Sequence, residues 1–193
     1  ASDVYKRQNS VTGVSETLEG NGVIETGSRS QSVEFLGIRT EDHILVSDLE
    51  NQVIIGEIGD FSSDKMSVLV GSRIAQRLNI KLADRLYLKG ALRSIPLRVG
   101  GIFETGVSQI DKRRIYINLQ TARAFTGKKS GGSVFQIAIK EPDQATQISA
   151  QMQETFGHRV VSWQEREKVW LEVFRALRIS SAITVSSLSL IHI

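Results

Sequence analysis

The 193-residue sequence contains no cysteine and only two prolines. Without cysteine, the chain has no disulfide, no thiolate metal site and no cysteine nucleophile. The absence leaves the cellular compartment open, because many domains of oxidising compartments have no disulfide either. The first residues also lack an apolar stretch of the kind found in a cleavable signal peptide.

Positive charge is in small excess, and the formal net charge is +3. Basic residues occur in short groups, at Lys112–Arg114 and Lys128–Lys129, and no aromatic residues alternate with them. A nucleic-acid-binding surface usually needs a continuous basic stripe or a recognisable module. We therefore expect no nucleic-acid partner.

Motifs of catalysis and metal binding are absent from the sequence. His43, His158 and His192 lie far apart, and none has a second ligand three or four positions away, as a zinc site on a helix would. No serine lies in a nucleophile elbow. Neighbouring carboxylates lack the apolar flanks that raise one pKa for acid–base catalysis. We expect no catalytic, cofactor-binding or metal-binding residue, and no enzyme.

The last part of the chain, from Trp163 to Ile193, contains neither Gly nor Pro, so nothing in the sequence ends a helix there. Residues 162–178 place apolar side chains at helical spacing opposite a charged face. Residues 179–193 carry no formal charge. This pattern fits a truncated transmembrane span, although the uncharged run covers only about 22 Å of a hydrocarbon core of about 30 Å. A buried or frayed terminal helix fits it equally well.

The rest of the sequence alternates β-prone runs with short helical segments, which indicates an α+β fold. Strands are expected over 11–14, 22–26, 32–38, 52–58, 66–70, 85–88, 95–103, 115–117, 134–139 and 159–162. Helices are expected over 43–49, 73–78, 119–125 and 144–156, and again from Trp163. Gly20–Gly22 is expected to form a turn, and Ser72 to act as an N-cap. The Gly100–Gly101 pair is expected to mark a bulge or a close backbone approach.

Three stretches carry a resemblance to a known family. The first runs from Gly71-Ser72-Arg73-Ile74-Ala75 to Ile80 and continues through Asp84 to Leu88; the second is Val99-Gly100-Gly101-Ile102-Phe103, then Gly106, Asp111, Tyr116-Ile117 and Ala122 through Gly127; the third is Val160-Val161-Ser162-Trp163. In this order and spacing they resemble the periplasmic core domain of MacB/FtsX-like ABC transporter permeases, which include the lipoprotein-releasing permeases.

The motif and turn positions of the resemblance are Gly71, Ala75, Leu78, Asp84, Gly101, Gly106 and Asp111. Asp84 and Asp111 are expected to accept hydrogen bonds from backbone amides in turns. Ala83 stands where the family usually has Gly, which restricts the backbone of that turn. The connection from Lys89 to Ser94 is short, so it leaves little room for a hairpin that recruits a periplasmic chaperone.

The resemblance implies a MacB-like periplasmic core domain with two small subdomains of mixed sheet plus helices. Residues 9–65 and 128–165 would form a discontinuous membrane-proximal subdomain, and residues 66–127 an inserted one. Residues 163–186 would form a helix that enters a truncated transmembrane segment. Residues 1–8 and 187–193 are expected to be non-native tails.

The resemblance also implies a function in the bacterial inner membrane, with this domain on the periplasmic side. It would couple ATP hydrolysis by a cytoplasmic ABC ATPase subunit to movement or release of a lipoprotein, lipid or other hydrophobic substrate. A second permease copy or a paralogue, and membrane lipid, would be the other partners. Mechanical coupling is expected from Trp163, Trp170, Phe174, Arg175 and Arg178, since the arginines lie where a helix would enter the membrane.

A second hypothesis accounts for the same residues. The chain could be a freestanding soluble α+β binding module without catalysis, whose last helix packs on the domain or on a partner. The two hypotheses differ in the sequence on either side, where only the permease predicts apolar spans.

Overall fold

The computed structural model describes residues 10–91, 93–128, 130–166, 168 and 172. Its contacts divide the chain into two units, residues 1–138 and residues 139–193, which are described separately. This boundary differs from the subdomains expected from the sequence, because strands from residues 9–65 and 66–127 share one sheet. The assignment of membrane-proximal and inserted parts stays a prediction.

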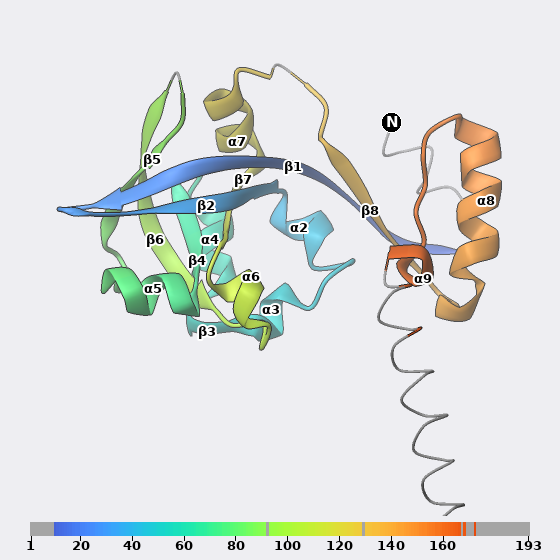
Figure 1. Ribbon diagram of the computed structural model, residues 1–193, viewed down its shortest axis with the longest axis horizontal. Coiled ribbons are helices and arrows are strands. Elements are labelled where there is room, and N and C mark those ends of the chain that lie inside the picture. Colours follow the sequence, from blue (N-terminus) through green and yellow to red (C-terminus); the bar gives the residue numbers. More distant parts are fainter. Residues whose placement is uncertain (1–9, 92, 129, 167, 169–171, 173–193) are drawn as a thin grey trace, which may run out of the picture. The chain divides into compact units, whose positions relative to one another are not determined.

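One mixed sheet organises the first unit (Figure 1). Its described strands are β1 Val11–Thr26, β2 Arg29–Ile38, β3 Val53–Gly56, β4 Ser67–Gly71, β5 Arg85–Lys89, β6 Ser94–Phe103, β7 Arg114–Asn118 and β8 Val134–Ile139. The pairing order is β2-β7-β4-β6-β5-β1, and β1 also pairs with β2, so six strands close into a ring. β3 adds to β6, and β8 adds to β1. The β2–β7 and β4–β6 pairs are parallel.

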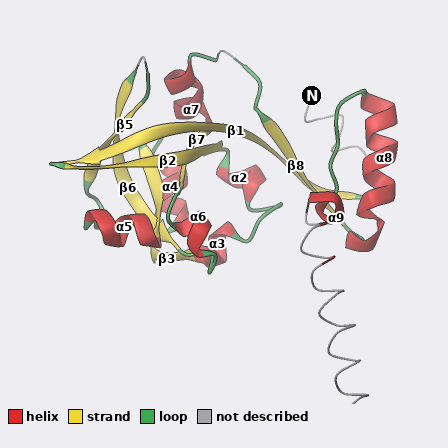
Figure 2. Ribbon diagram, in the orientation of Figure 1, coloured by secondary structure: helices red, strands yellow, loops and turns green. Residues whose placement is uncertain are grey.

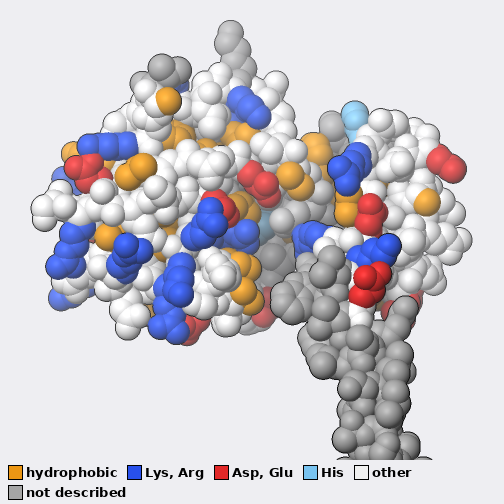
Figure 3. Space-filling model, in the orientation of Figure 1, with side chains coloured by type: hydrophobic (Ala, Val, Ile, Leu, Met, Phe, Trp, Pro, Cys, Tyr) orange, Lys and Arg blue, Asp and Glu red, His pale blue; other side chains and the backbone are white. Residues whose placement is uncertain are grey.

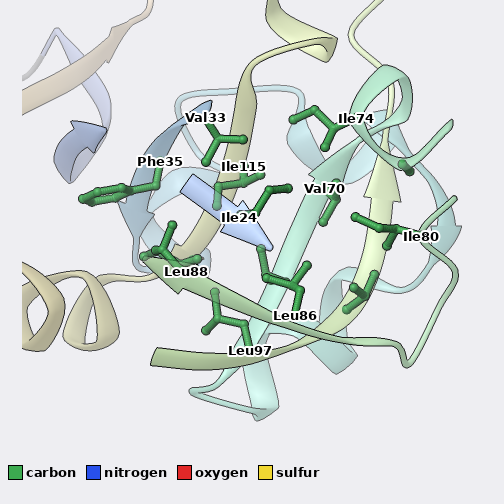
Figure 4. Close-up of a cluster of buried hydrophobic side chains, with 14 of the residues drawn as sticks. Ile24, Val33, Phe35, Val70, Ile74, Ile80, Leu86, Leu88, Leu97 and Ile115 are labelled. Carbon is green, nitrogen blue, oxygen red and sulfur yellow. The ribbon is translucent and has the colours of Figure 1, made fainter. Parts of the chain in front are cut away.

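The main core follows from period-two alternation along the strands. In β5, Leu86 and Leu88 are buried while their neighbours are exposed, and they pair with the buried Leu97 and the half-buried Ile95 of β6. These side chains converge with those of β1, β2 and β7 (Figure 4). Two helices, α5 (Ser72–Leu78) and α7 (Leu119–Thr126), add their apolar faces to the same core.

A second core lies on the other face of β4, β6 and β7. It contains Leu36, Ile38, Leu49, Phe61, Leu69, Phe103 and Tyr116. The ring of Phe103 meets that of Tyr116 edge-on, with centroids 5.0 Å apart. Short helices border this core: α2 Thr40–His43, α3 Leu49–Gln52, α4 Ile58–Ser63 and α6 Ser108–Asp111.

The prediction of a turn at Gly20–Gly22 is wrong, because both glycines lie inside the single long strand β1. A Cβ on Gly20 would lie 2.4 Å from Cζ of Phe35, and one on Gly22 would lie 2.7 Å from a methyl of Leu88. These glycines therefore allow large neighbouring side chains to pack against the strand instead of bending it.

The prediction that Ser72 caps α5 is also wrong, since Gly71 occupies the cap and Ser72 is the first helical residue. The hydroxyl of Ser72 donates instead to Oε1 of Glu104, at 3.1 Å. At the other end, Asn79 has φ 55°, and the amide of Ile80 donates to the carbonyl of Ala75, as in a Schellman motif.

Helices dominate the second unit (Figure 2). A 3₁₀ turn at Pro142–Gln144 leads into α8 (Ala145–Phe156), which ends at Gly157 with φ 65°, and α9 begins at Trp163 as predicted. The predicted strand over 159–162 is wrong, because this segment joins no ladder in the described part of the chain. The amide of Val160 donates to the side chain of Gln153 instead, at 3.3 Å.

The expectations for the end of the chain fall mostly outside the described residues. Trp170, Phe174, Arg175 and Arg178 are among those that the structure does not describe, as are both expected tails. In the described ranges, no helix is long and apolar enough to cross a membrane.

Candidate functional site

The predicted motif residues occupy several places in the first unit, and only some of them meet. Gly71 and Asp111 come together where β4 runs into α5, and Gly106 lies in the β6–α6 loop that leads to Asp111. Ala75 and Leu78 are buried on α5 in the main core and have a packing role. Asp84 and Gly101 lie elsewhere, in a turn and in β6.

The junction of Gly71 with Asp111 is the tightest of these contacts. A Cβ on Gly71 would lie 2.4 Å from the backbone carbonyl oxygen of Asp111. Real Cβ atoms essentially never approach an atom this closely, and a backbone carbonyl cannot rotate aside as a side chain does. Glycine at position 71 is therefore what allows α6 to lie against the end of β4.

The carboxylate of Asp111 holds the β6–α6 loop, as predicted for a turn aspartate. Asp111 is only 2% exposed, and its Oδ1 accepts from the amide and the hydroxyl of Thr105, at 2.9 and 2.7 Å. Gly106 follows with φ 79°, a conformation that favours glycine. The loop is thus closed by a buried carboxylate that has local partners.

The turn before β5 confirms the role predicted for Asp84, whose Oδ2 accepts from the amide of Lys81 at 2.8 Å. Ala83 adopts φ 69° in this turn. This is the left-handed conformation, in which a Cβ costs roughly 1–2 kcal/mol. The sequence departure at Ala83 is therefore a local strain in the structure.

An Ala83→Gly variant should be more stable than the wild type by about 0.5–1 kcal/mol, because relief of the left-handed strain outweighs the entropy of glycine. Urea unfolding measures the difference. Ala124→Gly is the matched control, since Ala124 is exposed in α7 and the same change there should destabilise by about 1 kcal/mol. Destabilisation by Ala83→Gly would contradict the strain.

Gly100 and Gly101 confirm the prediction of a bulge and a close approach. The β4–β6 register pairs Val68 with Val99 but Leu69 with Gly101, so Gly100 is the extra residue. A Cβ on Gly101 would lie 2.9 Å from the carbonyl oxygen of Ile55 in β3. The glycine pair lets β6 accept β3 and β4 on opposite edges at one point.

A buried polar group around His43 escaped the sequence reasoning. His43 is 2% exposed, its Nδ1 lies 3.2 Å from Oγ of Ser15, and its ring lies beside that of Tyr116. Burial first, and then the positive charge of Arg114, lower the pKa of His43 from 6.5 to about 4. Burial also raises the pKa of Tyr116 against the opposing effect of Arg114.

Ser15 and His43 resemble a catalytic serine–histidine pair, but a substrate cannot reach them. Ser15 is fully buried and His43 nearly so, so neither can meet a substrate in this conformation. Partners that lie far apart along the chain left no spacing signal in the sequence. The neutral imidazole acts here as a buried polar link between α2 and β1.

The start of the terminal helix is the candidate site of the second unit. The hydroxyl of Ser162 accepts from the amide of Glu165 at 3.2 Å, which caps α9. Nε1 of Trp163 and Nε2 of Gln164 both donate to the carbonyl of Pro142, each at 3.1 Å. The first turn of α9 is thereby tied to the segment that opens α8.

Among the described residues, no group of three or more His, Cys, Asp or Glu side chains lies together as metal ligands would. An open hollow between β1, β2 and β5 is bordered by Lys89 and Arg113. Both cations are already paired, Lys89 with Glu25 and Arg113 with Glu34.

Comparison with known proteins gives a family and a fold. The family model for the MacB-like periplasmic core domain matches residues 1–155. Three solved structures share the fold. The extracellular domain of the noncanonic ABC-type transporter YknZ from Gram-positive bacteria has a TM-score of 0.60 and 17% sequence identity, with 83% of each chain covered. The periplasmic region of MacB from Actinobacillus actinomycetemcomitans has a TM-score of 0.58 and 13% identity, with 82% of this chain and 74% of that chain covered, and a domain of a putative permease from Porphyromonas gingivalis has a TM-score of 0.55 and 14% identity, with 80% of this chain and 75% of that chain covered. None of the curated proteins compared with the chain matches it.

Proposed function

The chain belongs to the family of MacB-like periplasmic core domains, and on that premise we propose that it transmits motion between the membrane and the extracytoplasmic space. As a family member it is the periplasmic domain of a MacB-like ABC transporter permease, which works with an ATPase. We propose that ATP binding by a cytoplasmic ABC ATPase subunit moves the transmembrane helices. The domains of two permease copies, or of a copy and a paralogue, then move together or apart.

The observation that carries this proposal is the anchored start of the terminal helix. Trp163 and Gln164 share one carbonyl as acceptor, and Ser162 caps the first turn, so the helix starts from a fixed point in the second unit. No Gly or Pro follows in the sequence up to Ile193, so no hinge residue would absorb a displacement. We propose that residues 163–186 enter the membrane, with Arg175 and Arg178 at its surface.

The substrate we propose is a lipoprotein, a lipid or another hydrophobic molecule at the outer face of the bacterial inner membrane. The domain performs no covalent step in this proposal, since the ATPase supplies the energy and the permease domain supplies movement. The motif residues Gly71, Gly106 and Asp111 then act by keeping the β6–α6 loop rigid against β4.

The proposal is tested by measuring the distance between two permease copies in the full transporter with its ATPase. Because the chain has no cysteine, a Ser28→Cys change at the exposed β1–β2 turn gives one spin-labelled site per domain. The inter-label distance should change on ATP binding. Trp163→Phe with Gln164→Leu removes both donors to the carbonyl of Pro142. This change should weaken the coupling between ATP binding and the change in inter-label distance two- to thirty-fold, which is about 0.5–2 kcal/mol. ATPase activity should persist.

Val161→Ala is the matched control, because Val161 and Trp163 are equally exposed at 43%. The control should keep the wild-type distance change. No ATP-dependent change in the wild type would overturn the proposed function. A full change in the Trp163/Gln164 variant would show that the anchor does not carry the motion.

A further inference from the structure

Charge is segregated along the first unit to a degree that the small net charge conceals. Residues 41–64 contain seven acidic residues and neither Lys nor Arg, whereas residues 71–100 contain seven Lys or Arg and one acid, Asp84. We call the exposed members the acidic face (Glu41, Asp48, Glu50, Glu57 and Asp60) and the basic face (Arg73, Arg77, Lys81, Arg85 and Arg98). None of these ten forms an ion pair with another described residue.

The basic face includes an unfavourable pair within the sheet itself. Arg85 of β5 and Arg98 of β6 are directly opposite each other in the antiparallel register, and both are exposed. Like charges at such positions destabilise a strand pair. Figure 3 shows Lys and Arg side chains gathered over the side of the first unit that carries α5. This surface is therefore suited to an acidic partner that relieves the repulsion.

An apolar strip lies next to members of both faces. Ile54 and Ile55 of β3 and Leu82 of the turn before β5 are 53%, 46% and 46% exposed. Leu82 touches β3, because a Cβ on Gly56 would lie 3.0 Å from its Cδ1. β3 and β5 follow one another along the edge of β6 that is opposite β4. The strip thus has Glu50 and Glu57 flanking β3, and Lys81 and Arg85 flanking Leu82.

We propose that this surface is where the domain meets the same domain of a second permease copy. A two-fold axis that runs along the apolar strip brings the acidic face of each copy against the basic face of the other, twice. The strip then forms the apolar centre and the charges form the polar rim, as in other protein interfaces. The inference rests on the proposed function for the presence of a second copy.

A second copy fits this surface better than a membrane does. An anionic lipid surface would attract the basic face but repel the acidic one, whereas another copy satisfies both signs. Oppositely charged faces also steer the encounter from a distance and suppress wrong registers. Attachment of both copies to one transporter raises their effective concentration, so a weak contact is sufficient.

A charge swap tests the inference on the full 193-residue chain. Sedimentation velocity at about 0.01 M ionic strength, where the screening length is about 30 Å, should show self-association of the wild type, and about 1 M salt should remove it. Arg85→Glu with Arg98→Glu, and separately Glu50→Lys with Glu57→Lys, should each weaken self-association by about tenfold or more. An equimolar mixture of the two variants should restore association, because their reversed faces are again complementary.

Arg29→Glu with Lys128→Glu is the matched control, since both residues are exposed, lie outside the two faces and give the same change in net charge. It should self-associate as the wild type does. A monomeric wild type at low salt, or a mixture no better than either variant, would overturn the inference. A second result would also overturn it: the wild type binds phosphatidylglycerol vesicles, and Arg85→Glu with Arg98→Glu abolishes this binding but leaves self-association intact. Because no ATP is involved, failure here leaves the distance measurement on the transporter untouched.

Discussion

Replacing Gly71 by alanine should lower the free energy of unfolding by about 3 kcal/mol, at the upper end of what overpacking costs. The added Cβ would lie 2.4 Å from the carbonyl oxygen of Asp111, and the next two contacts are backbone atoms of the same residue. Relief requires α6 to move away from the end of β4. That movement would also strain the hydrogen bonds from Thr105 to the buried Asp111 carboxylate.

Urea unfolding of Gly71→Ala measures this cost, and Gly59→Ala is the matched control. Gly59 lies in α4, and a Cβ there meets nothing within 4 Å. Because alanine favours helix over glycine, the control should be neutral or stabilised by about 1 kcal/mol. Equal stability of Gly71→Ala and the wild type would show that α6 is not held against β4 as described.

The sequence predicted those parts of the fold that depend on local pattern. The strand expected over 85–88 is β5, and the Gly100–Gly101 pair indicates the bulge in β6. α7 was predicted to stop at Gly127, and that residue does adopt the left-handed conformation at the helix end. The end of α7 depends on residues within a few positions along the chain, so a short window contains its signal. The bulge also depends on Ile55 and Leu69 of the neighbouring strands, which the glycine pair alone does not identify.

The features that were missed depend on residues far apart in the sequence. Gly20 has the composition of a turn, but the ring that packs against it belongs to Phe35 on the next strand. His43 gave no signal because its partner Ser15 is 28 residues away. Ser72 has the composition of an N-cap, but Glu104 competes successfully for its hydroxyl. A pattern within one segment does not contain these contacts.

The candidate site was predicted unevenly for the same reason. The motif positions Gly71 and Asp111 are far apart in the sequence, and only the fold shows that they form one junction. In the sequence the basic residues form only short groups, such as Lys112–Arg114. The separation of acidic and basic residues into two faces becomes apparent once β3 and β5 are placed along one edge of β6.

Lowering the pH from 7 to 4 should cost the wild type about 3 kcal/mol of stability through His43 alone. Its pKa is 6.5 when unfolded and about 4 when folded. Because the folded pKa is the lower of the two, the unfolded chain takes up the proton first as the pH falls. The contribution of His43 to the free energy of unfolding is thus fully present above about pH 7 and is lost progressively as the pH falls from 6.5 to 4.

Urea unfolding between pH 7 and pH 4 measures the effect when the wild type is compared with His43→Asn. Carboxylates that titrate in this range contribute to both proteins, so their effects cancel in the difference. The variant has no imidazole to protonate, and its stability should therefore fall by about 3 kcal/mol less than that of the wild type. His158→Asn, at an exposed position in the second unit, is the matched control for the loss of an imidazole. Parallel curves for the wild type and His43→Asn would mean that folding does not lower the pKa of His43, and the buried environment described for its imidazole would then be wrong.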